Sequence, residues 1–149
     1  FISQLEADLT SPSLSTLSDI LECLGTSFDK FFSDEKDEKI VYGAEDSVVK
    51  SFEDEGYEIC WLVSDAQNND MEPIILTLSP GGKTSEDSPH GGEEFGYVLS
   101  GTVYVCLGDK SYKAKHGESF CFEPDQPHFL ENRGKSTAKV LWVSTPPSF

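Results

Sequence analysis

Basic residues are scarce in this sequence. Its 149 residues include 11 lysines and arginines against 27 aspartates and glutamates, so the net charge is −16 at pH 7. Arg133 is the single arginine. Because affinity for nucleic acid depends largely on the neutralisation of phosphates by lysine and arginine, the sequence predicts that this chain alone binds DNA poorly. The same negative field would repel an anionic membrane surface.

Long apolar runs and paired cysteines are also missing. The sequence contains no apolar stretch of about 18 residues and no basic start followed by an apolar segment, so we expect neither a membrane span nor a secretory signal. Cys23, Cys60, Cys106 and Cys121 stand singly in apolar runs without a Cys-x-x-Cys pair. They predict buried free thiols rather than a zinc cluster or a disulfide framework. A reducing compartment, the cytoplasm, suits such a chain.

Short β-type segments fill the chain from residue 40 onward. They are rich in β-branched and aromatic residues and are separated by clusters of Gly, Asp and Asn, which favours a mainly β sandwich or barrel. The expected strands are Ile40–Tyr42, Val48–Phe52, Tyr57–Val63, Pro73–Leu78, Phe95–Leu99, Thr102–Leu107, Ser111–Lys115, Phe120–Phe122, Phe129–Glu131 and Ala138–Ser144. We expect Ser100-Gly101 to join two of them, Phe95–Leu99 and Thr102–Leu107, as a hairpin.

The pattern before residue 40 is helical. Ser11-Pro12 has the composition of a helix start, with serine as the N-cap and proline at the first helical position. Leucines and an isoleucine then recur at helical spacing until Gly25, and a second short helix is expected through Phe31-Phe32. The sequence thus predicts a helical appendage over residues 1–33, a charged linker over 34–39 and a β domain over 40–149.

Histidine occurs three times, and two of the three stand in two spaced motifs. Three residues separate His90 from Glu94, and six more precede Gly101. Ten residues separate Gly117 from His128, and three more precede Asn132. Because strand side chains alternate between faces, Glu94 shares a face with residues 96 and 98, and His128 with residues 130 and 132. We expect both faces to point into the same small barrel.

These two motifs resemble the paired motifs of the cupin superfamily, over residues 80–149. The resemblance implies a small jelly-roll β-barrel with metal ligands His90, Glu94 and His128. The family has a further histidine where this chain has Ser88, and a proline and a glycine where it has Glu123 and Asp125.

The ligand set that remains is two histidines and a carboxylate, which suits a divalent Fe, Zn, Ni or Mn ion and leaves coordination positions open. We assign Ser88, Tyr97 and Asn132 to ligand binding in the same pocket. The alternative is a polar pocket that binds an organic molecule without metal, with Glu94 as a hydrogen-bond acceptor. His116, in a turn, is expected to be exposed.

The N-terminal segment resembles the end of a lambda-repressor-like helix-turn-helix domain, through Ile2–Glu6, Ser11–Leu17, Leu24-Gly25 and Phe31-Phe32. The resemblance implies that Ser3 and Gln4 belong to a DNA-reading helix. The earlier helices of such a domain are missing here, and basic residues are absent between Glu6 and Pro12. We therefore expect DNA binding only through a complete helix-turn-helix domain. The alternative for this segment is a helical cap packed on the barrel.

The two resemblances together imply an effector-sensing cupin domain of a transcription regulator, with a small-molecule effector as its partner. The second candidate is a mononuclear non-haem metal enzyme of oxygenase or epoxidase type, since the ligand set supports oxygen chemistry. No dedicated general base or cosubstrate-binding arginine is apparent near the motifs, so we assign no catalytic residue and favour the sensor. The resemblance also implies a homodimer formed mainly by the β domain, because cupin barrels commonly pair through outer strands and regulators of this type read two half-sites as dimers.

Overall fold

A computed structural model describes residues 5, 10–23, 26, 28–32, 39–64, 66 and 69–149. Ser3 and Gln4, and most of the expected linker, lie outside these residues. The chain divides into two compact units, Phe1–Ile40 and Val41–Phe149. None of the helices in the described part is long and apolar enough to cross a membrane.

The first unit contains helix α2, Leu14–Cys23, and helix α3, Phe28–Phe32. Ser13 caps α2, because its Oγ accepts a hydrogen bond from the Thr16 amide at 3.2 Å and its carbonyl accepts one from the Leu17 amide at 2.8 Å. The expected start at Ser11-Pro12 is therefore wrong by two residues, since Ser13 is the serine whose side chain reaches the free amides of the first turn.

The second unit contains a short 3₁₀ helix, η1 (Ala44–Asp46), and nine strands. The strands are β1 Val48–Phe52, β2 Tyr57–Trp61, β3 Glu72–Leu78, β4 Glu93–Ser100, β5 Thr102–Leu107, β6 Lys110–Lys115, β7 Ser119–Phe122, β8 His128–Glu131 and β9 Ala138–Thr145. The strand expected at Ile40–Tyr42 is wrong. Ile40 and Val41 are 86% and 80% exposed, so in this structure they gain no burial that would favour a strand.

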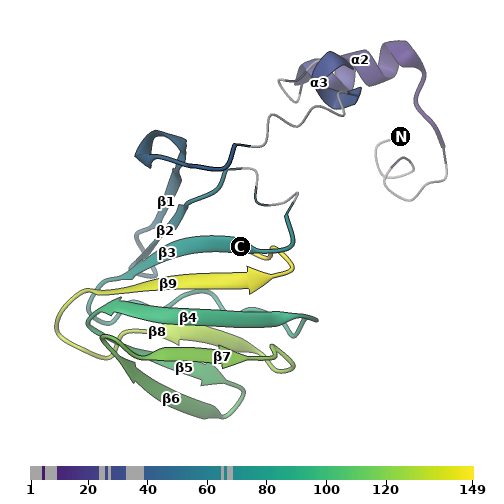
Figure 1. Ribbon diagram of the computed structural model, residues 1–149. Helices are drawn as coiled ribbons and strands as arrows, with labels where there is room; N and C mark the ends of the chain where they lie inside the picture. Colours follow the sequence, from purple (N-terminus) through teal and green to yellow (C-terminus); the bar gives the residue numbers. More distant parts are fainter. Residues whose placement is uncertain are drawn as a thin grey trace. The chain divides into compact units, whose positions relative to one another are not determined.

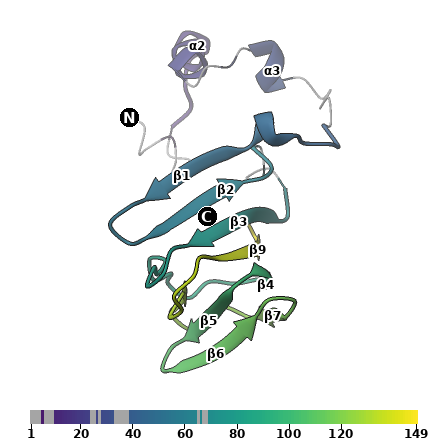
Figure 2. The ribbon, with the colours of Figure 1, turned by 90° about the vertical axis from the view of Figure 1, so that its left-hand side faces the viewer.

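The strands form two antiparallel sheets. The larger has the order β1-β2-β3-β9-β4-β7 and the smaller has the order β6-β5-β8. The larger sheet can be followed from β1 to β4 in Figure 1, and Figure 2 shows the same unit from the side. Side chains from both sheets share one core, which includes Leu76, Val98, Val105, Leu130 and Val140. The prediction of a mainly β fold with a short helical appendage is confirmed.

The expected hairpin between residues 95 and 107 is wrong. Strand β4 pairs with β7 and β9, whereas β5 pairs with β6 and β8. A β-bulge lies between Val98 and Ser100, and Gly101 has a φ of 77°. A Cβ at Gly101 would lie 2.8 Å from the Ala138 Cα. This turn therefore carries the chain from one sheet to the other, and it requires glycine.

All four cysteines are free, as expected, but they are not all buried. Cys106 is buried, Cys60 is partly buried, and Cys23 and Cys121 are exposed. Cys121 lies on β7, where the exposed positions alternate with the partly buried Phe120 and Phe122. β7 lies at the edge of the larger sheet, and one of its faces is in solvent. The apolar sequence around Cys121 does not indicate which residues lie on that exposed face.

Candidate metal centre

The sheets bring together the three residues of the two motifs. Glu94 is the second residue of β4 and is 1% exposed, and His128 is the first residue of β8 and is 0% exposed. The expected alternation is confirmed, because Glu94 and Val98 of β4, and His128 and Leu130 of β8, all face inward.

His90 comes from the loop before β4, and its side chain is 25% exposed. Its amide donates to the Pro124 carbonyl at 2.9 Å. The loop turns at Gly92, which has a φ of 103°, and a Cβ there would lie 1.6 Å from the Thr145 carbonyl oxygen. Only glycine allows this close approach to β9, and the turn brings His90 back towards Glu94.

The centre is built around the Glu94 carboxylate. Its Oε1 lies 3.2 Å from His90 Nε2 and 3.1 Å from His128 Nε2. Its Oε2 accepts a hydrogen bond of 3.0 Å from Trp142 Nε1. One ligand atom from each of His90, Glu94 and His128 lies within 4.8 Å of the others. The tryptophan thereby fixes the carboxylate and leaves Oε1 to the two imidazoles.

Both imidazoles are oriented by main-chain carbonyls. His90 Nδ1 lies 3.0 Å from the Gly91 oxygen, and His128 Nδ1 lies 3.0 Å from the Gln126 oxygen. A carbonyl only accepts, so each Nδ1 carries the proton, and in a neutral ring Nε2 then presents a lone pair. Both lone pairs face Glu94 Oε1, itself an acceptor. The arrangement therefore requires a proton at this point, on an imidazole or on Glu94, or a metal ion.

The separations of the two imidazole nitrogens from Glu94 fit a metal ion. Bonds of 2.0–2.2 Å place neighbouring ligands of an octahedral ion about 3.0 Å apart, close to the 3.1 and 3.2 Å separations at Glu94. An Nδ1–H held by a carbonyl is the usual arrangement of a ligating histidine. The pKa of His128 is raised, because the hydrogen bond to Glu94, the contact with Gln126 and nearby acidic charges together outweigh burial, which lowers it. The same features favour a cation at this point.

Two residues that sequence reasoning missed support the centre. Trp142 could not be assigned to the centre from the sequence, because the pairing of β9 with β4 is not a local feature of the sequence. Asp87 exchanges two backbone hydrogen bonds with His128, of 2.9 and 3.1 Å. Paired residues of antiparallel strands point to the same face, so Asp87 faces the interior beside His128. Burial raises its pKa, and His128 and His90 oppose that shift.

The other residues assigned to the site are not part of this group of three. Ser88 is exposed in the loop that carries His90. Tyr97 is 38% exposed on the face of β4 opposite to Glu94. Asn132 lies four residues along from His128, roughly 13 Å in a strand. The exposed His116 lies outside the centre.

Asn132 is engaged in structural hydrogen bonds. Its amide nitrogen donates to the carbonyls of Leu78, Ser79 and Ser136 at 3.1, 3.1 and 2.8 Å. Its Oδ1 accepts from the Gly134 amide at 2.9 Å. This buried side chain therefore holds together the chain segments at the far end of β8.

Comparisons with known proteins agree with this geometry. Residues 74–144 match the Cupin_2 family model, described as a cupin domain. The HTH-type transcriptional regulator PuuR of Escherichia coli is 29% identical over 150 residues, which cover 99% of this chain and 80% of that protein. A solved HTH_3 family transcriptional regulator from Vibrio cholerae is 27% identical, with a TM-score of 0.57, over 98% of this chain and 79% of that one.

A further solved structure, described as FeII HppE, is 25% identical, with a TM-score of 0.61. The match covers 89% of this chain and 76% of the HppE chain. The barrel fold and the cupin resemblance expected from the sequence are thereby confirmed.

Proposed function

We propose that this chain, whose residues 74–144 match the Cupin_2 family model, is the effector-sensing cupin part of a helix-turn-helix transcription regulator. The observation that carries the proposal is the similarity to two such regulators over 99% and 98% of the chain, which includes its helical N-terminal part. In this proposal residues 1–33 are the end of the DNA-binding domain, 34–39 are the linker and 40–149 are the sensor. A regulator of this kind works in the cytoplasm, which free cysteines suit.

DNA is then reached through a complete helix-turn-helix domain, with Ser3 and Gln4 as candidate base contacts. With a net charge of −16, residues 1–149 alone should give no sequence-specific shift of DNA at a salt concentration of about 150 mM. A specific shift at that salt would contradict this division of labour between the two parts.

We infer that His90, Glu94 and His128 hold a divalent ion, with Fe, Zn, Ni and Mn as the candidates. When bound, the ion supplies a Lewis-acidic position with open sites for water or an effector atom. The protein supplies neutral imidazoles, held by the Gly91 and Gln126 carbonyls, and a carboxylate fixed by a hydrogen bond from a tryptophan. Sensing would follow from the effector binding beside this ion.

The metal content of three proteins tests this inference. Wild type, His90→Asn and the control His116→Asn are stripped with chelator, reconstituted with each candidate metal, and measured by mass spectrometry of the elements. We expect about one ion per chain in wild type and in His116→Asn, and a loss of affinity of at least about tenfold in His90→Asn. Equal metal content in all three would sink the metal site. Mass spectrometry of small molecules that copurify would identify the effector.

The second candidate, an oxygenase or epoxidase-like enzyme, is favoured by the likeness to the FeII HppE structure and by the same three ligands. It is less favoured because Arg133 is unsuited to holding a cosubstrate. Arg133 is paired with Glu131 and lies 4.3 Å from the Tyr104 ring, on the outer face of the smaller sheet. Oxygen uptake by the Fe(II)-loaded protein above that of His90→Asn would favour the enzyme.

We also propose a homodimer formed by the β domain. Support comes from the outer face of β4, where Phe95, Tyr97 and Leu99 are 42%, 38% and 39% exposed. Sedimentation of the wild-type chain at micromolar concentration should give a dimer, and Tyr97→Glu should shift it towards monomer. Wild type that sediments only as a monomer would contradict the proposal.

A further inference from the structure

A cavity of about 350 Å³ lies beside the metal centre. The larger sheet, the loop before β4 and the C-terminal residues contribute to its wall. The lining residues are Lys50, Phe52, Tyr57, Ile59, Trp61, Thr84, Ser85, Asp87, Trp142, Ser148 and Phe149. Its volume suits a small organic ligand.

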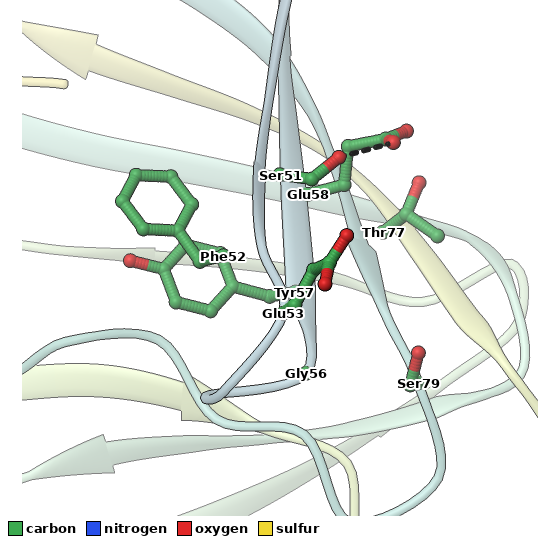
Figure 3. Close-up of a pocket in the computed structure, with 8 residues that line it drawn as sticks. All are labelled: Ser51, Phe52, Glu53, Gly56, Tyr57, Glu58, Thr77 and Ser79. Atoms are coloured by element: carbon green, nitrogen blue, oxygen red, sulfur yellow. Dashed lines mark hydrogen bonds between the residues drawn. The ribbon is translucent and has the colours of Figure 1, made fainter.

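The β1–β2 hairpin provides one aromatic wall. Phe52 pairs with Tyr57 across the hairpin, and their rings stack with centroids 4.4 Å apart. Figure 3 shows these two rings on one side of the hairpin and the Ser51 and Glu58 side chains on the other. Strand alternation places Lys50, two residues before Phe52, on the ring side. The hairpin therefore presents aromatic rings and one ammonium group to the cavity.

Trp142 and Phe149 provide further aromatic lining, and their ring centroids are 4.8 Å apart. Phe149 is held in place by Glu72, which is 3% exposed. Glu72 Oε2 accepts hydrogen bonds from the Ser148 and Phe149 amides at 3.0 and 2.8 Å. A planar ligand body would thus meet aromatic rings from two parts of the chain.

The cavity adjoins the metal centre through two of its lining residues. Trp142 donates to Glu94, and Asp87 is the backbone partner of His128. The charges at this end are the carboxylates of Glu94 and Asp87, which together balance a divalent ion. With the ion bound, Lys50 is the charged side chain that remains unbalanced among the residues that line the cavity.

Lys50 is the lysine among the lining residues, and its Nζ lies 4.8 Å from the centroid of the Phe52 ring. Glu72 uses its Oε2 for the C-terminal amides and lines a neighbouring cavity. Without the metal, the proton that the centre then requires leaves the two carboxylates and Lys50 without net charge. The net positive charge of the cavity therefore depends on the metal.

We propose that this cavity is the effector site and that it takes a compact monoanion with a planar apolar body, such as an aromatic carboxylate. Lys50 holds the acid group, and the ring contacts the aromatic lining. The inference rests on the proposed metal site, because the ion gives the cavity its net positive charge.

Calorimetric titration of the zinc-loaded chain tests the charge and the shape together. Benzoate, benzyl alcohol and benzylamine share a ring and differ in charge. We expect benzoate to bind at least tenfold more tightly than the other two, since a charge-assisted contact contributes about that much. Lys50→Gln should remove this preference, and Lys50→Arg should keep most of it. Lys113→Gln is the matched control, because Lys113 is exposed on β6 of the smaller sheet.

Tighter binding of benzylamine than of benzoate by the zinc-loaded protein would overturn the inference, and so would equal affinities or a preference unchanged in Lys50→Gln. Failure of the proposed metal site is seen separately, as absence of zinc uptake before any ligand is added. In metal-free protein the net positive charge is lost, so the preference for benzoate over benzylamine should fall. A preference as strong as that of the zinc-loaded protein would also count against the charge assignment.

Discussion

Replacement of Glu94 by glutamine changes a single atom of the centre and should separate metal binding from folding. Both histidine Nε2 atoms lie against Oε1, and Trp142 donates to Oε2. A glutamine amide can place its NH₂ group where Oε1 was, with one hydrogen for each imidazole lone pair, and its oxygen can still accept from Trp142. In the metal-free variant each donor of this network then faces an acceptor. In wild type, by contrast, Glu94 Oε1 faces an imidazole lone pair at both His90 and His128.

The expected gain follows from those two contacts. Each new hydrogen bond contributes about 0.5–1.5 kcal/mol. Metal-free Glu94→Gln should therefore be about 1–3 kcal/mol more stable than wild type at a pH above the raised pKa of His128, where that imidazole is neutral. For a unit of this size that is an increase in Tm of roughly 4–12 °C. A neutral amide is a poor metal ligand, so the variant should lose the stabilisation that wild type gains from metal, about 2.7 kcal/mol at 100 times the Kd.

Thermal unfolding of both proteins, with chelator and with metal, measures the two effects. Glu93→Gln is the control, because Glu93 is exposed on the opposite face of β4 and should change neither quantity. Metal stabilisation of Glu94→Gln equal to that of wild type would refute the ligand assignment. A metal-free variant less stable than wild type by several kcal/mol would refute the account of the hydrogen bonds.

Three further predictions concern the frame around the centre. Asn132→Ala should lower the free energy of unfolding by about 2–4 kcal/mol, because it removes a buried hub of hydrogen bonds, and leave metal affinity unchanged; a lower metal affinity would place Asn132 at the site after all. Gly96→Ala should destabilise by about 1–3 kcal/mol, because the new Cβ would lie 2.0 Å from the Phe120 ring. Adding Phe120→Leu should restore part of the lost stability. A double variant no more stable than Gly96→Ala would rule out this clash as the cause. The pKa of Glu131 is lowered from 4.5, since burial raises it but hydrogen bonding to Arg133 and nearby positive charges prevail. The Glu131 carboxylate thus contributes stability above about pH 4.5, and this contribution is lost as the pH falls through the lower folded pKa. Glu131→Gln should therefore reduce the loss of stability at acid pH. An unchanged loss would count against a stabilising Glu131–Arg133 pair.

Local pattern predicted most of the β domain. Val48–Phe52 and Thr102–Leu107 are strands with the expected bounds, because alternation and turn residues are properties of neighbouring residues. The same period of two predicts which face of β4 carries Glu94 and which face of β8 carries His128. That period also places Tyr97, three residues from Glu94, on the outer face.

The pairing of distant strands could not be predicted. A glycine turn after β4 has the same composition whether the chain folds back or crosses to the other sheet, and here it crosses. Trp142 and Asp87 contact the centre only because β9 pairs with β4 and residue 87 pairs with residue 128. Such contacts depend on register between segments far apart in sequence, so the ligands could be identified before the residues that support them.

Both tryptophans of the chain, Trp61 and Trp142, line the same cavity. The ultraviolet emission of this protein therefore comes from the proposed effector site, and no added dye is needed to observe it. Because Trp142 is one hydrogen bond from Glu94, ions with partly filled d shells should quench its emission at contact range, whereas filled-shell Zn²⁺ should chiefly shift it. A planar effector lying against either indole should alter the spectrum differently. One cuvette could thus follow metal entry and ligand entry as two distinct optical events.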